Sequence, residues 1–267
     1  MTELRIDFPL ERGRTVSALG PIDLDVAAGS FVAVVGPSGC GKSTLLRAIA
    51  GLAVPSAGSV RIAGAPPAAL VANHQLGIAF QDHALLPWLT VRENIALPFH
   101  LAHRAVDTAR IEELIALVGL AEFAGARPRQ LSGGMRQRVG IARALSVGPE
   151  VLLMDEPFGA LDAQIRQVMA VELLKIWERD RKTIVFITHD IDEAVFLADR
   201  VIVMSASPGR VLEIIPVDLP RPRPLTLRNH PGFVAYRERI WNLLEDEVRS
   251  SLNWQAADDA APLVPAL

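Results

Sequence analysis

A glycine-rich segment, GPSGCGKST at residues 36–44, contains the residue types that bind phosphate. It follows the apolar run FVAVV at 31–35 and precedes a helical pattern, which is the strand, loop and helix order that such a loop requires. Glycines let backbone N–H groups converge on phosphate oxygens, and a helix N-terminus adds a positive dipole end. The residues predicted to bind a nucleotide are Gly36, Pro37, Ser38, Gly39, Cys40, Gly41, Lys42, Ser43 and Thr44.

Four side chains near this loop have individual predicted roles. Lys42 would reach the β and γ phosphates of a nucleoside triphosphate, and the Ser43 hydroxyl would coordinate Mg²⁺. A second apolar run, VLLMD at 151–155, ends in two acids. Since these acids follow a buried strand, we expect Asp155 to bind Mg²⁺ and Glu156 to polarise the attacking water as a general base. A solvated turn is the alternative for two adjacent acids.

Short β-branched runs position these residues. The runs at 31–35, 151–155, 183–187 and 201–204 alternate with helical patterns, which indicates an α/β fold with a parallel sheet covered on both faces. More than 100 residues separate the first two runs, too many for one crossover, so we expect an inserted lobe. Part of that lobe is predicted to be helical.

Two later segments show helical periodicity. The first, 163–179, has an apolar stripe of Ile165, Val168, Met169, Leu173, Ile176 and Trp177. The second, 232–249, has a stripe of Phe233, Ile240, Trp241, Leu244 and Val248. The last stretch, QAADDAAPLVPAL at 255–267, shows neither periodicity nor caps, and we expect 248–267 to be a flexible tail.

Composition excludes several classes of protein. The net charge of -3 and the pI near 6.1 give no large positive field, so a nucleic-acid partner is not expected. The basic clusters at 221–228 and at Arg136, Arg138 and Arg143 are interpreted as solvated surface. Charged residues interrupt the N-terminus where a signal peptide would be apolar, and no window of about 18 apolar residues occurs. The single cysteine, Cys40, suits a reducing compartment.

The segment LSGGMRQR at 131–138 resembles the signature of the ATP-binding cassette (ABC) ATPases. Together with GPSGCGKST, Gln81, VLLMDEP, GALD at 159–162 and THD at 188–190, it completes a set of motifs in the order of that family. The resemblance covers about residues 4–245. It implies a P-loop NTPase (RecA-like) core with a parallel sheet, an N-terminal antiparallel β subdomain and an α-helical subdomain inserted at about 83–148. The ATPase domain would span 1–247.

The resemblance also implies ATP and Mg²⁺ as cofactors and a head-to-tail homodimer, or a pair with a second ABC subunit. Ser132, Gly133 and Gly134 of one subunit would close on the ATP bound at Lys42 of the other. Gln81 would sense Mg²⁺ and the attacking water, His189 would contact the γ-phosphate, and Asp162 would cross the interface. Phe8 is the candidate for stacking on adenine. The ordinary alternatives are a surface Gln, a solvated His and an Asp that caps a helix.

The segment ALLPWL at 84–89 is apolar although it lies just after Gln81. Taken alone, it indicates a buried loop corner. In ABC transporters the segment after this Gln borders a groove that receives a permease helix, so Gln81–Leu89 is expected to contact an integral membrane permease with Trp88 as an anchor.

The longer stretch LLPWLTVRENIALPF resembles the importer ATPases for nitrate, aliphatic sulfonates and taurine. This resemblance implies an energy-coupling subunit on the cytoplasmic face of the cell membrane, assisted indirectly by a periplasmic or extracellular solute-binding protein. The alternatives are an exporter ATPase of the lipoprotein-release or macrolide type and a soluble ABC ATPase without a transport role.

Overall fold

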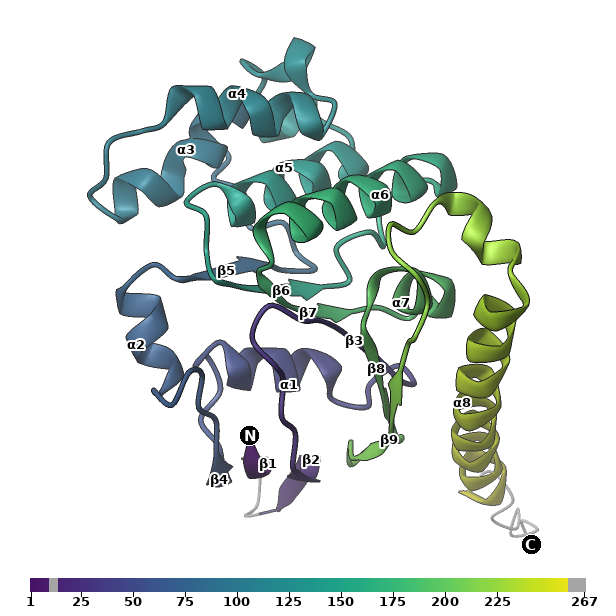
Figure 1. Ribbon diagram of the computed structural model, residues 1–267. Coiled ribbons are helices and arrows are strands. Elements are labelled where there is room, and N and C mark those ends of the chain that lie inside the picture. The colour runs from purple at the N-terminus through teal and green to yellow at the C-terminus, as the bar shows by residue number, and fades with distance from the viewer. Residues whose placement is uncertain (10–13, 259–267) are drawn as a thin grey trace, which may run out of the picture.

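A six-stranded sheet forms the centre of the computed structural model, which describes residues 1–9 and 14–258, with only the backbone of 250–258 (Figure 1). Five strands are parallel, and the sixth is antiparallel to its neighbour. In spatial order they are β5 (Leu76–Ala79), β6 (Val151–Asp155), β7 (Thr183–Ile187), β3 (Phe31–Val35), β8 (Arg200–Met204) and the antiparallel β9 (Val211–Pro216). The four predicted strands are therefore confirmed, while the antiparallel edge was not predicted.

Both faces of the sheet are covered. Phe31, Ala33 and Val35 of β3 point into a core beneath the upper helices, whereas Val32 and Val34 point into a second core that contains α1 (Lys42–Ile49). Because successive side chains of a strand alternate between faces, a strand buried on both sides must be apolar at every position. This explains the uninterrupted FVAVV run.

The upper layer consists of helices with polar N-caps. It contains α3 (Val91–Leu101), α4 (Thr108–Leu117), α5 (Gly133–Leu145) and α6 (Ala163–Asp180), with short 3₁₀ turns at Ala121–Phe123 and Pro128–Gln130 (Figure 1). The capping side chains are Thr90, Asp107, Ser132 and Asp162, and each accepts a hydrogen bond from the first turn of its helix. These caps satisfy N–H groups that otherwise lack partners, so they fix where each helix begins.

A small antiparallel sheet lies on the other side of α1. Its strands are β2 (Thr15–Ile22), β1 (Thr2–Pro9) and β4 (Ala57–Ser59), in that spatial order. Leu4 and Leu19 of this sheet share a core with Leu45 and Leu46 of α1. The helix that follows the glycine-rich loop is thus held between two sheets, and the short α2 (Pro67–Ala72) follows β4.

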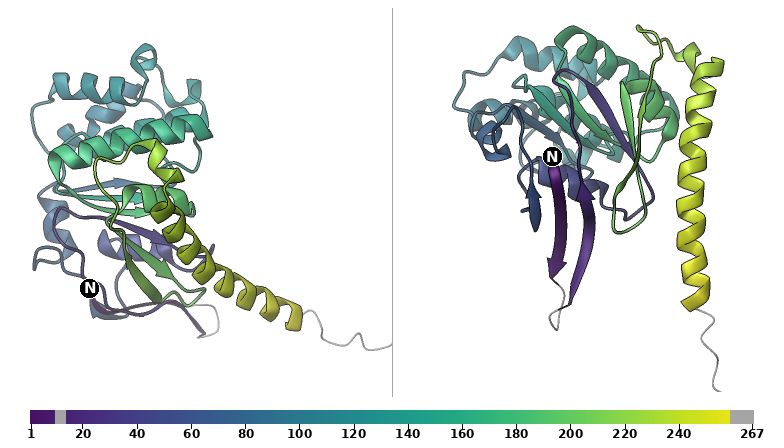
Figure 2. Two further views of the ribbon diagram at one scale, coloured as in Figure 1. Left: turned by 45° about the vertical axis from the view of Figure 1, so that its right-hand side comes forward. Right: turned by 60° about the horizontal axis from the view of Figure 1, so that its bottom comes forward.

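The C-terminal part consists of α7 (Ile191–Leu197), a 3₁₀ turn at Leu225–Asn229 and α8 (Pro231–Asp258). In both views of Figure 2, α8 runs along one side of the molecule, and in the left view its far end extends beyond the rest. The domain boundary expected at residue 247 falls inside this helix, because 248–258 are helical. The remainder of the expected tail, 259–267, lies outside the described residues. None of the described helices has the length and apolarity needed to cross a bilayer.

Three residues of the predicted stripes are exposed. Val168 is 53% exposed, Trp241 is 59% exposed and Val248 is 42% exposed. The cause is geometric, because helical periodicity gives the direction of an apolar stripe but not the width of the surface that covers it. The expected solvation of the 221–228 cluster is also wrong for Arg223. This side chain is 4% exposed, and its guanidinium donates to backbone carbonyls at the end of α7.

Candidate functional site

The glycine-rich loop has a backbone that requires glycine at specific positions. Gly39 and Gly41 have φ angles of 76° and 99°, in the left-handed region that other residues rarely adopt. A Cβ atom on Gly41 would also lie 2.7 Å from the Leu19 side chain and 2.8 Å from the Ala18 carbonyl oxygen. Strand β2 therefore supports the loop directly where α1 begins.

Two predicted magnesium ligands meet beside this loop. The Ser43 hydroxyl donates to Asp155 Oδ1 at 3.1 Å. Asp155 is only 5% exposed, and this burial raises the pKa of its carboxyl group, an effect that the Ser43 hydrogen bond opposes. A hydroxyl and a carboxylate oxygen at this distance fit Mg²⁺, which commonly takes one or two protein oxygens together with substrate phosphates and water.

Lys42 has its ammonium group at the same loop. The residue is 7% exposed, and Nζ donates to the carbonyl oxygens of Gly36 at 2.8 Å and Pro37 at 2.9 Å. The charge is thus held within the loop that was predicted to bind phosphate. Such a fixed cation is suited to the β and γ phosphates of a nucleotide.

Gln81, Glu156 and His189 converge on one point. His189 Nδ1 lies 3.3 Å and Gln81 Nε2 lies 3.5 Å from the same oxygen, Glu156 Oε2. The three residues follow β5, β6 and β7, which are adjacent and parallel. Because parallel neighbours end at the same edge of a sheet, residues 81, 156 and 189 must meet there.

The backbone of Glu156 has an unusual conformation. Its φ angle is 46°, and its N–H donates to the Ile187 carbonyl oxygen at 3.0 Å. Non-glycine residues adopt this left-handed region at a cost of about 1–2 kcal/mol, and functional sites are where such conformations concentrate. The turn directs the Glu156 carboxylate toward Gln81 and His189.

The signature segment forms a separate helix start. Ser132 caps α5 by accepting a hydrogen bond from the Met135 N–H at 3.2 Å. A Cβ atom on Gly134 would lie 3.1 Å from the Ala160 carbonyl oxygen, so this segment packs closely on the loop that ends at Asp162. Within the described residues, no hydrogen bond or ion pair joins 132–134 to the glycine-rich loop. Within the described part of the chain, the two predicted phosphate-binding surfaces are therefore not bonded to each other.

Asp162 caps α6. Its Oδ1 accepts hydrogen bonds from the N–H groups of Gln164 and Ile165, so the capping interpretation is confirmed.

Phe8, the candidate for stacking on adenine, lies on the β1–β2 pair. It is 45% exposed and lies opposite Val16, which is also 45% exposed. Two residues further along β2, Ala18 contacts Gly41. Phe8 is thus part of an exposed apolar pair on strands that pack against the loop.

The segment 84–89, which we term the ledge, is held at the surface by Asn94. This residue is fully buried, and its amide donates to the carbonyl oxygens of Leu86, Leu89 and Thr90 while accepting from the Leu86 N–H. Trp88 is 65% exposed, whereas Leu85 packs against the core. The buried-corner interpretation therefore holds for Leu85 and is wrong for Trp88.

Arg143 connects the ledge to α5. Its guanidinium donates to the carbonyl oxygens of His83 and Ala84, each at 2.7 Å. The side chain is half-buried, and burial lowers its pKa. The solvated-surface interpretation of Arg143 was wrong, because a sequence cannot show that an arginine finds backbone carbonyls about 60 residues away.

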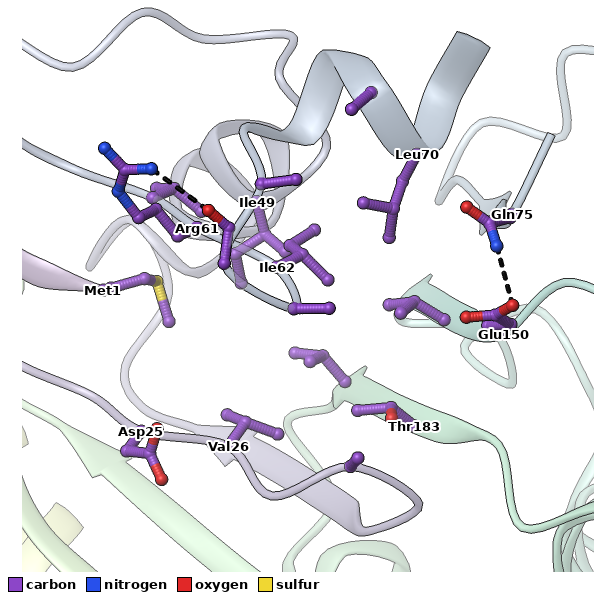
Figure 3. A pocket seen from close by; sticks show the side chains of 18 of the residues that line it. Met1, Asp25, Val26, Ile49, Arg61, Ile62, Leu70, Gln75, Glu150 and Thr183 are labelled. Atoms are coloured by element: carbon purple, nitrogen blue, oxygen red, sulfur yellow. Dashed lines mark hydrogen bonds between the residues drawn. The ribbon is translucent and has the colours of Figure 1, made fainter. Parts of the chain in front are cut away.

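A cavity of about 690 Å³ lies elsewhere in the molecule (Figure 3). Figure 3 shows Val26, Ile62 and Leu70 facing it, with Glu150 and Thr183 at the start of β6 and β7. Nucleotide sites of parallel sheets lie at the opposite, carboxyl ends of the strands. The cavity is therefore distinct from the site around Lys42 and Glu156.

In this sheet β3 leads through a glycine-rich loop into α1, and two acids stand at the end of β6, which is separated from β3 by β7. This arrangement defines a P-loop nucleoside triphosphatase. The ABC transporter family matches residues 19–159. An ATP-binding protein of Brucella abortus is 52% identical over 229 residues, which cover 84% of this chain and 86% of that protein. The chain therefore belongs to the ABC transporter family, as the motifs indicated.

One further relative and one structure complete the comparison. The aliphatic sulfonates import ATP-binding protein SsuB of Bacillus subtilis is 46% identical over 236 residues, which cover 88% of this chain and 90% of that protein. A dimeric ATP-binding cassette solved in a post-hydrolysis state with ADP and Pi has a TM-score of 0.75 and 33% identity. The match covers 81% of this chain and 97% of that one.

Proposed function

We propose that this chain is the ATP-hydrolysing, energy-coupling subunit of an ABC importer for a small solute of the nitrate, aliphatic sulfonate or taurine type. The observation that carries the enzymatic part is the convergence of Gln81, Glu156 and His189 beside the Ser43–Asp155 pair. The import part is supported by the similarity to an aliphatic sulfonate import protein and by the exposed ledge.

In the proposed reaction, ATP binds with its β and γ phosphates at Lys42 and the loop amides. Ser43 and Asp155 would hold Mg²⁺, which supplies charge neutralisation for the phosphates. Glu156 accepts a proton from the attacking water, Gln81 orients that water, and His189 donates a hydrogen bond to the γ-phosphate. Phe8 would stack on the adenine.

The separation of the signature segment from the phosphate loop supports a head-to-tail dimer. Ser132, Gly133 and Gly134 present a helix N-terminus, which favours an anion, and Asp162 lies on the adjoining loop. Each ATP would then lie between the loop of one subunit and residues 132–134 of the other. A dimer with a second, different ABC subunit would satisfy the same geometry.

The permease partner would bind on the surface formed by Gln81–Leu89 and a neighbouring groove. The groove has a volume of about 280 Å³ and is lined by Phe80, Leu97, Leu101 and Arg143 among others. An apolar groove with an exposed tryptophan nearby suits a short helix of a membrane protein. In this proposal the chain would lie at the cytoplasmic face of the membrane, and a solute-binding protein outside the cell would act through the permease.

The substitution Trp88→Ala tests the permease contact. In a reconstituted complex with the permease, solute uptake per ATP should fall about 10-fold or more, because aromatic anchors supply much of the energy of such interfaces. The ATPase rate of the isolated chain should stay within about 2-fold, since Trp88 lies outside the catalytic cluster.

Trp241→Ala is the matched control, because Trp241 is 59% exposed on α8, and it should change neither quantity. Equal loss of uptake in both variants, or a loss of basal turnover in Trp88→Ala, would contradict the permease contact. An assay with nitrate, taurine and alkyl sulfonates then identifies the solute class.

A further inference from the structure

A closed polar network surrounds the backbone of His189. The Thr188 hydroxyl donates to Glu193 Oε2 at 2.6 Å and accepts from the Asp190 N–H at 3.0 Å. Asp190 Oδ1 accepts from the Glu193 N–H at 3.1 Å and so caps α7. The residues on both sides of His189 are therefore fixed, while its imidazole is free to face Glu156.

Arg166 of α6 joins this network from another element. Its NH1 donates to Asp190 Oδ2 at 3.3 Å, and its Nε lies 3.5 Å from Glu193 Oε1. Its NH2 donates to the Leu161 carbonyl oxygen at 3.2 Å. One guanidinium thus contacts the loop that carries His189 and the loop 159–162, which ends at Asp162.

The environment makes these contacts strong constraints. Glu193 is only 3% exposed, and burial raises its pKa to about 7, while Thr188 and Arg166 oppose that shift. A buried carboxyl group with fixed partners is costly to displace, because moving it leaves polar groups unpaired. A displacement of loop 159–162 would therefore move Arg166 and, through Asp190 and Glu193, the backbone of His189.

We propose that Arg166 is a positioning residue that couples the loop 159–162 to His189. When a partner subunit closes on this loop, the guanidinium transmits its position to the imidazole that faces the γ-phosphate. The inference rests on the proposed role of His189. It also accounts for the position of Arg166 one turn after Asp162, where its side chain is 28% exposed. None of the described hydrogen bonds of Arg166 reaches the glycine-rich loop.

The decisive experiment compares Arg166→Met with Arg179→Met. Arg179 is the matched control, since it lies on the same helix and pairs with Asp180 and Glu113 at the other end. Arg166→Met should lower kcat about 10-fold or more with KM within about 2-fold, because misplacing a catalytic group by about 1 Å has effects of that size. Arg166→Lys should restore part of kcat, and Arg179→Met should leave it unchanged.

A double-mutant cycle with His189→Ala separates positioning from stability. In the His189→Ala background, Arg166→Met should cause no further loss of kcat, while its effect on the melting temperature should be the same in both backgrounds. An equal additional loss of kcat in both backgrounds, or no loss in either, would overturn the inference.

A spectroscopic readout distinguishes the coupling through Arg166 from the proposed role of His189 at the γ-phosphate. The imidazole NMR signals of His189 in the ATP-bound chain should move in Arg166→Met and stay in place in Arg179→Met. Unmoved signals would overturn the coupling whatever the kinetics. Full turnover by His189→Ala would instead overturn the proposed role of His189, and the NMR signals would still report the coupling itself.

Discussion

The glycine-rich loop and the signature segment both place glycines at the start of a helix, yet their surroundings differ. At the first, Gly41 provides no side-chain cap, Lys42 is buried, and Asp155 at the end of β6 lies within reach, although β7 separates β6 from β3. At the second, Ser132 caps its own helix and packs beside Ala160. In the proposed function the first region binds phosphate and performs the chemistry, whereas the second only binds phosphate.

This difference follows from the elements that carry each region. The glycine-rich loop lies at the edge of the parallel sheet where the strands end. Because β5, β6 and β7 are adjacent and parallel, the polar residues that follow them lie close together at this edge. The signature segment lies on the helical lobe, and it packs on the segment between Glu156 and Asp162, which begins at the sheet edge that carries Gln81, Glu156 and His189. The experiments below test this division of roles.

The largest expected effect is that of Glu156→Gln. Glutamine preserves the shape but cannot accept the proton, so turnover should fall about 100- to 10,000-fold. ATP binding, measured by equilibrium titration, should be retained, and ATP should convert the chain into a stable dimer visible by light scattering. Glu172→Gln on the surface of α6 is the control. Unchanged turnover in Glu156→Gln would exclude Glu156 as the general base.

Mixing two inactive variants tests the division between subunits. Lys42→Ala removes the phosphate loop cation and Ser132→Arg blocks the signature segment, so each alone should lose about 100-fold or more in turnover. An equal mixture should recover roughly a quarter of the wild-type rate, because half of the dimers would contain one intact composite site of two. No recovery above the separate variants would refute the composite site.

A smaller effect concerns stability and pH. Burial raises the pKa of Glu193 to about 7, so the folded chain holds this proton more tightly than the unfolded chain does. The contribution of Glu193 to the free energy of unfolding therefore falls as pH rises from about 4 to 7, by on the order of 3 kcal/mol. Denaturant titrations should show Glu193→Gln gaining stability relative to the wild type over this range. Parallel curves would contradict the raised pKa.

The last prediction concerns the reactivity of Cys40 rather than turnover or stability. This thiol is 1% exposed and burial raises its pKa, so little thiolate is accessible. A maleimide should label the folded chain at least about 100-fold more slowly than the denatured chain, and ATP should slow it further. Labelling at the rate of a free thiol would show that the phosphate loop is not packed as described.

The sequence predicted those features that lie close together along the chain. The loop at 36–44, the acids after 151–155 and the Ser132 cap each depend on a strand or helix boundary that local residue types mark. The antiparallel β9, the exposed face of Trp241 and the contacts of Asn94 and Arg143 were not predicted. Each of these features depends on which distant part of the chain packs against the residue or accepts its hydrogen bonds, and a single sequence does not show that.

Arg166 illustrates the same limit at the site itself. Its partners at 190 and 193 are more than 20 residues away, and an arginine on a helix of mixed polarity has nothing that distinguishes it from a solvated one. The sequence nevertheless contained an indication of this role. Arg166 stands four residues after Asp162, which caps the helix, and residues four apart on a helix lie on the same face, so Arg166 lies on the face nearest the loop 159–162.

The left-handed backbone at Glu156 means that selection for stability and selection for turnover would favour different residues at position 156. Glycine or asparagine would adopt this conformation more readily, so a chain selected only for resistance to heat would lose Glu156, the proposed general base. Laboratory evolution of this cassette for thermostability would therefore need a growth or transport requirement at every round, or the gain would come from residue 156 at the expense of turnover.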